Sequence, residues 1–378
     1  MSFRLLIGKR LLKLVLLLVL VSGLAVGCTG IDTVPMGWSG ATIDDGVVFL
    51  GSMEGKLVAV DMMSQERRWP DVPFKASAQT GVFSCGRGTT TVAIYGSPVV
   101  AGELVYIAGH NGKIYAINSE TGALRWVYPR EEESDPNPII GGPAVAFGKV
   151  FFGSSDGRIY ALDATTGDRQ WEFETGDKIW STPSIAGDTV YIGSFDKKLY
   201  ALNVADGSKK WEFVTEGTIV ASPLVYDDTV YIGSFDRYLY ALNAADGSLK
   251  WPPFLAENWF WARPVAYNGV IYAGSVDGKV YALSAGNGDK IAEFDLESPV
   301  SSSPVLVDDS IIVASEEGRV YSLNTGTNQK RQLVDLEEKI FSPLSASNGV
   351  VYIHSEKDVL YAVDALSGAT RWSLPLKS

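Results

Sequence analysis

The fold of this chain is decided by a stretch that recurs along it, most clearly as Ser222-Pro223-Leu224-Val225, Val230-Tyr231-Ile232-Gly233-Ser234, Leu239-Tyr240-Ala241-Leu242-Asn243, Gly247 and Trp251. The proline that opens each copy returns every 39 to 45 residues, at Pro98, Pro143, Pro183, Pro223, Pro264, Pro304 and Pro343. An earlier copy has Ala41 in place of the proline, so eight copies fill the chain from about Trp38 onwards. Self-similarity at such a period is the signature of a repeat architecture.

Each copy contains four short runs that are rich in β-branched and aromatic residues, which is typical of strands. In the copy that opens at Pro183, the runs cover residues 183–185, 189–193, 198–202 and 210–213. Asp-Gly or Asn-Gly pairs join the second run to the third and favour a tight hairpin. We therefore predict an all-β fold, an eight-bladed β-propeller of four-stranded antiparallel blades. An open β-solenoid or several small domains are the alternatives, but a lone four-stranded blade has little core of its own.

Six of the ten tryptophans close a repeat: Trp69, Trp126, Trp171, Trp211, Trp251 and Trp372. A tryptophan packed between blades removes roughly 150–250 Å² from water, which corresponds to an upper bound of about 4–6 kcal/mol. We predict that these six residues dock neighbouring blades. The sixth and seventh copies have Ala292 and Gln332 at this place, so the joints after blades six and seven are expected to be the weakest.

The end of the third copy resembles the closing motif Ala-x-Asp-x-x-Thr-Gly-x-x-x-Trp of the PQQ-like propeller repeat. The match runs from Ala161 to Trp171 and includes Asp163, Thr166 and Gly167. This resemblance implies that the chain belongs to one of two branches of the PQQ-like propeller family. Quinoprotein dehydrogenases bind pyrroloquinoline quinone and Ca²⁺ in an eight-bladed propeller. The BamB-type lipoproteins use a similar propeller, without a cofactor, as a protein-binding scaffold in outer-membrane protein assembly.

The N-terminus has the layout of a lipoprotein-type signal peptide, which we assign to residues 1–27. Four basic residues precede the apolar run 14–20, which is too short for a comfortable membrane span. Cys28 follows small residues and resembles the lipidated cysteine of a lipobox, although Ala25 stands where leucine is preferred. Ordinary cleavage before Cys28 and an uncleaved anchor are the alternatives. We assign 28–36 to the lipidated cysteine and a short linker, and 37–378 to the propeller.

The charge of the chain excludes a nucleic-acid-binding function. The net charge is −12, and residues 1–27 hold four basic residues and no acid, so the remainder carries −16. Nucleic acids are negatively charged and bind to basic protein surfaces instead. With Cys28 lipidated, Cys85 has no partner for a disulfide within the chain. The acidic run 131–133 is expected to be a solvated loop, because its spacing matches no Ca²⁺ loop.

The sequence offers no recognisable catalytic site. It has no Cys-Cys pair, which quinoprotein dehydrogenases commonly carry beside the quinone, and leaves little room for the insertions that hold their Ca²⁺ ligands. Its two histidines, His110 and His354, are expected to be surface residues at strand ends. We predict no enzyme and no cofactor, and keep a quinone- and Ca²⁺-dependent dehydrogenase and a small-ligand-binding propeller as alternatives.

Residues that break the repeat are the candidates for partner binding: Trp180, Trp259, Phe260, Trp261 and Arg263. The third position before the opening proline is aromatic or apolar in all blades but one: Trp38, Tyr95, Ile140, Trp180, Val220, Trp261, Ser301 and Ile340. Trp259 has no counterpart in the two preceding loops, whereas Phe260 replaces an isoleucine. Packing is the alternative role for these aromatic residues.

Arg263 stands where other blades have serine, threonine or glycine, at the start of the run expected nearest the propeller axis. We expect it to bind an acidic partner or a carboxylate, or to pair with a local acid such as Glu257. The insertion 71–91, which contains Cys85, is a further candidate because long loops are often functional. The sequence thus predicts a lipid-anchored extracytoplasmic scaffold that binds envelope proteins through a loop face.

Overall fold

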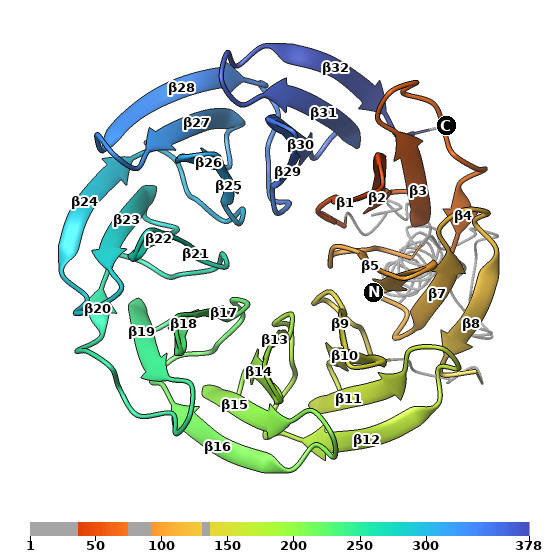
Figure 1. The fold of residues 1–378 in the computed structure, drawn as a ribbon, viewed down its shortest axis with the longest axis horizontal. Helices are drawn as coiled ribbons and strands as arrows, with labels where there is room; N and C mark the ends of the chain where they lie inside the picture. The colour runs from red at the N-terminus through yellow and green to blue at the C-terminus, as the bar shows by residue number, and fades with distance from the viewer. Residues whose placement is uncertain (1–36, 75–91, 131–136, 378) are drawn as a thin grey trace, which may run out of the picture.

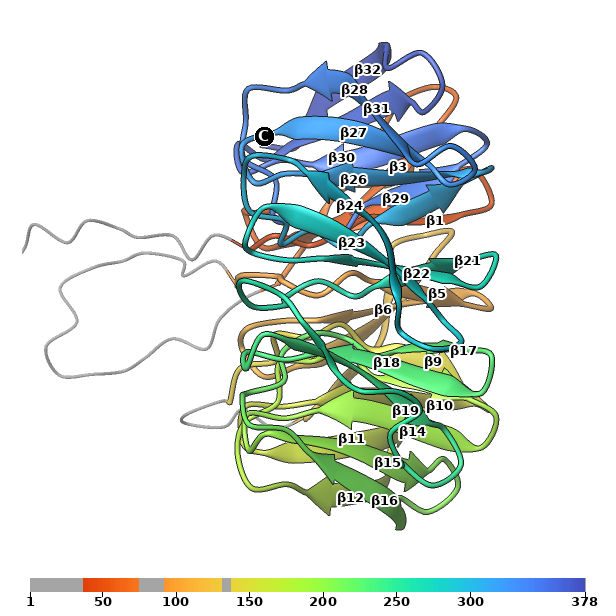
Figure 2. The ribbon, with the colours of Figure 1, turned by 90° about the vertical axis from the view of Figure 1, so that its left-hand side faces the viewer.

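The computed structural model describes residues 37–74, 92–130 and 137–377, which form a closed ring of eight sheets (Figure 1). Every sheet consists of four antiparallel strands that are consecutive in the chain and run in order from the axis outwards. The side view shows the sheets stacked side by side as blades (Figure 2). The predicted all-β, eight-bladed propeller is confirmed. None of the described residues forms a helix that is long and apolar enough to cross a membrane.

The strands of the first four blades are β1 (Thr42–Asp44), β2 (Val47–Gly51), β3 (Lys56–Asp61), β4 (Val72–Pro73); β5 (Val99–Ala101), β6 (Leu104–Ala108), β7 (Ile114–Asn118), β8 (Leu124–Tyr128); β9 (Ala144–Ala146), β10 (Lys149–Gly153), β11 (Arg158–Asp163), β12 (Arg169–Glu174); β13 (Ser184–Ala186), β14 (Thr189–Gly193), β15 (Lys198–Asn203) and β16 (Lys209–Val214).

The strands of the last four blades are β17 (Leu224–Tyr226), β18 (Thr229–Gly233), β19 (Tyr238–Asn243), β20 (Phe254–Leu255); β21 (Val265–Tyr267), β22 (Val270–Gly274), β23 (Lys279–Ser284), β24 (Lys290–Asp295); β25 (Val305–Val307), β26 (Ser310–Ala314), β27 (Arg319–Asn324), β28 (Gln329–Asp335); β29 (Ser345–Ser347), β30 (Val350–His354), β31 (Val359–Asp364) and β32 (Thr370–Pro375).

The burial of each strand follows its place in the blade. Neighbouring blades cover both faces of the second and third strands, so every residue of β14 and the central four residues of β15 are buried. The fourth strand is outermost and is mostly exposed, with one buried side chain in blades two, three, four and six. In β16 this is Trp211, while Lys209 and Lys210 beside it are exposed. Continuous apolar runs in the middle of each repeat therefore reflect a sheet that is covered on both faces.

The hydrophobic core is divided among the eight joints between neighbouring blades. At one joint the Trp211 indole lies against Gly247 of the next blade, where a Cβ would be 2.6 Å from ring atom Cε3. The indole Nε1 donates a hydrogen bond to the Ala244 carbonyl at 3.0 Å. The same two contacts recur at Trp69, Trp126, Trp171 and Trp251. Glycine is needed here because its positive φ and missing side chain make room for the indole.

Three joints lack this arrangement. Trp372 of blade eight is partly exposed, and no described residue accepts a hydrogen bond from its indole. Blade six has Ala292 at this place. In blade seven the register shifts, so that Arg331 lies opposite Ser322, the pairing that tryptophan makes in blades two, three, four and eight. The prediction that Gln332 occupies this place was therefore wrong, because the bulge moved along the strand pair.

The ring closes between blades eight and one without an exchanged strand, since each forms its own sheet and β1 contacts β29. His354 is fully buried in this joint, so the expectation of a surface histidine was wrong. Its Nδ1 lies 2.9 Å from the Ser39 carbonyl oxygen and its Nε2 lies 2.9 Å from Oδ1 of Asp358. That carboxylate oxygen also accepts a hydrogen bond from the Met53 amide at 3.0 Å.

Truncation of a docking tryptophan should destabilise the ring strongly. We expect Trp211→Ala to lower the free energy of unfolding by roughly 3–5 kcal/mol, because it removes a buried ring and leaves a cavity. Trp372→Ala serves as the matched control and should have a smaller effect, since that ring is partly exposed. Urea unfolding of both variants measures the difference. A Trp211→Ala midpoint equal to that of the wild type would contradict the assignment.

Candidate functional site

The connections between blades and the turns between second and third strands lie together on one side of the ring, which we call the loop face. Backbone hydrogen bonds tie each turn to the connection beside it. The amides of Phe195, Phe235 and Val276 donate to the carbonyls of Lys178, Thr218 and Trp259 at 2.9–3.0 Å. The chain ends on the same side of the ring, after β32 (Figure 2). Residues of this face that differ from blade to blade are therefore held by the same backbone hydrogen bonds.

An aromatic cluster stands on the loop face where blades five and six meet. The ring of Trp259 stacks on Phe235 with centroids 4.8 Å apart, and the ring of Trp261 lies 5.6 Å from the same phenylalanine. Trp259 remains 45% exposed, which is unusual for a tryptophan already stacked on one side. Phe235 was not among the predicted residues, although its counterpart Phe195 in blade four was a signal that this turn carries aromatic residues.

Phe260, between these two tryptophans in the chain, has a different role. It is only 1% exposed and packs against Gly233, where a Cβ would lie 2.2 Å from the phenylalanine Cβ. Ile179 and Ile219 make the same contact with Gly153 and Gly193 in the preceding blades. Phe260 therefore belongs to the core of the joint, and its place among the partner-binding candidates is corrected.

A second aromatic group surrounds Trp180 in blade four. Its ring meets that of Phe195 edge to face, with centroids 4.6 Å apart. The ammonium of Lys178 lies 4.9 Å from the Trp180 ring centroid and 4.4 Å from that of Phe195. Cation–π attraction holds this lysine over the two rings. Trp180 and Trp261 both line the axial channel, on opposite sides of blade five.

The axial channel is a cavity of about 1140 Å³ whose mouth on the loop face is aromatic. Trp38 lies 4.7 Å from Tyr95 and 5.9 Å from Phe341, measured between ring centroids. The structure places Phe341, not Ile340, at the lining position, because Ser345 pairs in blade eight as Val305 pairs in blade seven. Ile340 is instead fully buried in the joint, so the predicted alignment was wrong by one residue.

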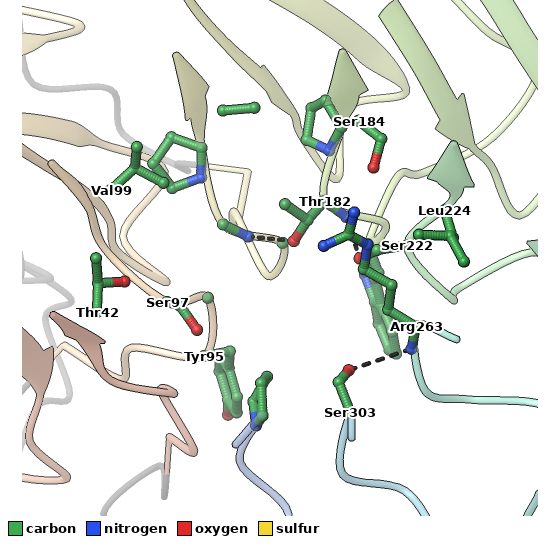
Figure 3. A pocket seen from close by; sticks show the side chains of 18 of the residues that line it. Thr42, Tyr95, Ser97, Val99, Thr182, Ser184, Ser222, Leu224, Arg263 and Ser303 are labelled. Carbon is green, nitrogen blue, oxygen red and sulfur yellow. Dashed lines mark hydrogen bonds between the residues drawn. The ribbon is translucent and has the colours of Figure 1, made fainter. Parts of the chain in front are cut away.

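Arg263 extends into this channel from the start of β21, close to the axis (Figure 3). Its Nε donates a hydrogen bond to the Pro223 carbonyl at 3.3 Å. The side chain contacts solvent, yet the channel walls surround it, and this partial desolvation lowers the pKa of Arg263. None of the described acidic residues forms an ion pair with it or lines the channel.

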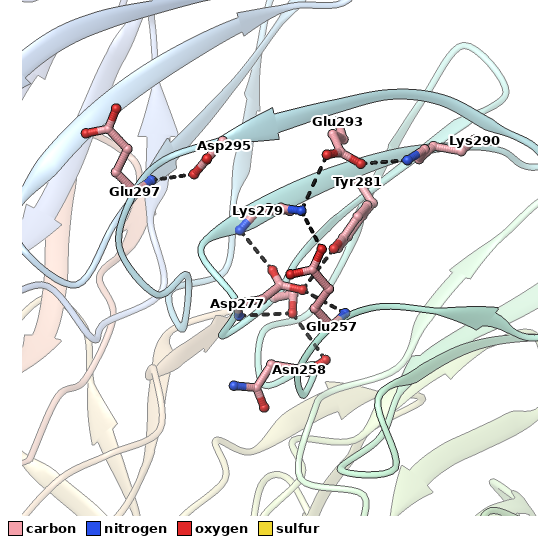
Figure 4. A network of polar contacts seen from close by, with 10 residues as sticks. Glu257, Asn258, Asp277, Lys279, Tyr281, Lys290, Glu293, Asp295 and Glu297 are labelled. Atoms are coloured by element: carbon pink, nitrogen blue, oxygen red, sulfur yellow. Dashed lines mark hydrogen bonds and ion pairs between the residues drawn. The ribbon is translucent and has the colours of Figure 1, made fainter.

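Glu257, expected as a partner for Arg263, is engaged elsewhere. Its Oε1 lies 2.8 Å from the ammonium of Lys279, which also approaches Glu293 at 3.5 Å (Figure 4). Lys290 completes this chain of ion pairs at 2.6 Å from Glu293. Exposed pairs of this kind contribute little stability. Because Glu257 is paired with Lys279, it does not pair with the guanidinium of Arg263 in the channel.

Tyrosine–aspartate pairs fix the turns of the loop face in four consecutive blades. The hydroxyls of Tyr160, Tyr200, Tyr240 and Tyr281 donate to Asp156, Asp196, Asp236 and Asp277 at 2.6–2.9 Å. Burial is the main cause that raises the pKa of each tyrosine, and the hydrogen bond to the neighbouring carboxylate raises it further. These hydroxyls are therefore rigid, protonated anchors rather than catalytic acids.

Two family models match the sequence. A model described as Beta-alanine-activating enzyme, beta-propeller matches residues 149–378. A PQQ-type model described as Outer membrane protein assembly factor BamB matches residues 30–178 and 75–211. The chain belongs to the PQQ-like β-propeller family. No curated protein matches the sequence.

Two solved structures show how widely the fold of this PQQ-like propeller is shared. BamB from Moraxella catarrhalis is 21% identical, with a TM-score of 0.67 over 84% of this chain and 90% of that chain. The computationally designed Ika8 protein is 14% identical, with a TM-score of 0.70 over 85% of this chain and 94% of that chain. At these identities the likeness establishes the fold alone.

The residues of this PQQ-like propeller do not fit the Ca²⁺ that the dehydrogenase branch binds together with its quinone. Ca²⁺ takes 6–8 oxygen ligands, several of them carboxylates. The described residues contain no group of three His, Cys, Asp or Glu side chains that could hold a metal, and the channel lining has no acid. The guanidinium of Arg263 in the channel would also repel a divalent cation. We therefore derive no step through either group. Cys28, Cys85 and the run 131–133 lie outside the described residues.

The tyrosine anchors predict a loss of stability in alkali. The unfolded chain releases tyrosine protons near pH 10, whereas the four anchored tyrosines retain theirs in the fold because their pKa values are raised. The free energy of unfolding should thus fall as the pH rises above about 10. Urea unfolding across this range measures it, and Asp236→Asn should bring the pKa of Tyr240 down. Stability that stays constant to about pH 11 would contradict this.

Proposed function

We propose that this PQQ-like propeller is a non-catalytic, extracytoplasmic scaffold that binds other envelope proteins through its loop face. Outer-membrane protein assembly, the activity named in the description of the BamB model, is the specific role that we propose. The acidic net charge of the chain suits a soluble domain outside the cytoplasm better than one that adheres broadly to anionic lipid.

The exposed tryptophan of the loop face is the observation that carries this proposal. Trp259 is held in one orientation by Phe235 and leaves 45% of its surface free. A pre-ordered aromatic side chain loses little conformational entropy on binding, and tryptophan dominates interface hot spots. Trp261 and the group around Trp180 extend the aromatic surface to the mouth of the channel.

A catalytic role has less support, because neither histidine is paired with a nucleophile among the described residues. His354 is buried in the closing joint with Asp358. His110 packs 5.7 Å from the Tyr95 ring, and burial lowers its pKa. Neither is hydrogen-bonded to a described serine, threonine or cysteine side chain, as a base that activates a nucleophile would be.

Cross-linking in native membranes tests the proposed binding face. An amine-reactive reagent should link Lys178, beside Trp180, to envelope proteins. Trp259→Ala should reduce the yield at least about tenfold, since truncation of a hot-spot residue costs about 2 kcal/mol or more. Its melting temperature should stay near that of the wild type, because the ring is exposed.

Phe147→Ala is the matched control. This aromatic residue is 68% exposed in the turn between β9 and β10, at the other end of the blade. Cross-links that survive Trp259→Ala, or that fall equally in Phe147→Ala, would contradict the assignment of the loop face.

We further propose that a lipid on Cys28 anchors the protein to the membrane. Cells grown with a fatty-acid probe should label the wild-type protein and should not label Cys28→Ala, which should be released into the soluble fraction. Immunoprecipitation followed by detection of the probe makes the comparison. Equal labelling of the two proteins would rule out this anchor while leaving the binding face untouched.

A further inference from the structure

The axial channel has one charged side chain among the described residues that line it, Arg263. The same position in the other blades holds only small or neutral residues: Gly40, Ser97, Gly142, Thr182, Ser222, Ser303 and Pro343. These small residues leave open space in front of the arginine, whose guanidinium points across the channel towards Ser222 and Thr182 (Figure 3). A propeller does not need a cation here, since seven blades form without one.

The hydroxyls around Arg263 are arranged to donate. Thr182 Oγ1 accepts a hydrogen bond from the Gly142 amide at 2.8 Å, and Ser222 Oγ accepts one from the Thr182 amide at 3.2 Å. Ser303 Oγ likewise accepts from the Arg263 amide at 3.1 Å. No described residue accepts a hydrogen bond from any of these three hydroxyls. Each hydroxyl therefore keeps its proton available for a ligand in the channel.

The charge of Arg263 is left uncompensated by the described residues. The channel walls partly remove it from water, which is unfavourable for a cation without a counter-ion. Among the described residues, the Pro223 carbonyl is the one acceptor for its side chain, and it bonds to Nε. The two terminal nitrogens retain their protons for a planar, bidentate anion such as a carboxylate.

We propose that the axial channel is a binding site for a small organic carboxylate with an apolar body. The carboxylate pairs with the Arg263 guanidinium and accepts hydrogen bonds from the hydroxyls of Thr182 and Ser222. The apolar body extends towards the loop face and packs against the rings of Trp261 and Trp180, which line the same cavity. A cavity of about 1140 Å³ accommodates such a molecule. This site does not depend on the protein-binding role of the loop face.

Benzoate and benzyl alcohol form the matched probe pair, since they share a ring and differ in charge. Titration of the purified protein is followed by calorimetry and by tryptophan fluorescence, because Trp180 and Trp261 line the cavity. We expect one saturable benzoate site and at least about tenfold weaker binding of benzyl alcohol, as expected when a charge-assisted hydrogen bond is lost.

Arg263→Ser introduces the serine that both neighbouring blades have at this position, and it should weaken the binding of benzoate at least about tenfold. Arg263→Lys keeps the charge without the planar fork and should give an intermediate affinity. Arg125→Ser removes another exposed arginine, from the outer strand β8, and should change nothing. Circular dichroism and thermal melting of Arg263→Ser should match the wild type, because the side chain stands in the channel.

Three results would overturn the proposal: no saturable benzoate binding to the wild type, equal affinity for benzyl alcohol, or equal benzoate affinity in Arg263→Ser. Cross-linking of the loop face to envelope proteins is a separate measurement, so failure of the channel site and failure of the scaffold function are distinguishable.

Discussion

The contact between neighbouring blades is the constraint on which the rest of this structure depends. A single four-stranded sheet of this sequence is apolar on both faces and can bury them only against other sheets. In five joints an indole covers the turn glycine of the next blade near the rim. In five joints an aliphatic or aromatic residue covers the glycine that ends the second strand. The eight joints together bring the last blade back to the first.

These joints also decide which aromatic residues remain available for function. Phe260 and Trp259 are adjacent in the chain, yet the first fills a joint and the second stacks on the outside of the loop face. The channel differs, because the starts of the first strands lie inside the ring and are linked between blades by hydrogen bonds such as that from the Thr182 amide to Ser222. Arg263 is tolerated there because its side chain extends into the channel, while its amide and Nε donate to Ser303 and Pro223 of the two neighbouring blades.

The repeat alone predicted the number of blades, the strands in each blade and the glycine turns, because these features recur with a fixed spacing. Predictions from the repeat were wrong where the alignment between blades shifted by a single residue. Blade eight places Phe341, not Ile340, on the channel because the extra residue lies before β29 rather than after it. Blade seven moves its bulge, so that Arg331 replaces Gln332. A spacing of 39 or 41 residues between opening prolines does not show where in the repeat a residue was lost or gained. The hydrogen-bond register between strands decides this position.

The closing joint departs from the repeat on both of its sides. In the other joints a glycine or alanine at the end of the second strand meets an apolar residue of the next blade, as Gly193 meets Ile219. Blade eight has His354 at the glycine position, and blade one has Gly37 at the isoleucine position. A Cβ at Gly37 would lie 2.0 Å from the Ile94 carbonyl oxygen, so the backbone of Ile94 leaves no room for a side chain there.

The histidine changes the chemistry of closure. The imidazole has to find two hydrogen-bond partners inside the joint, and it finds them in the Ser39 carbonyl and in Asp358. Asp358 in turn holds the Met53 amide of blade one. An apolar joint tolerates any complementary shape, whereas buried polar groups require particular partners. Blade eight therefore meets blade one through contacts that none of the other blade faces can supply.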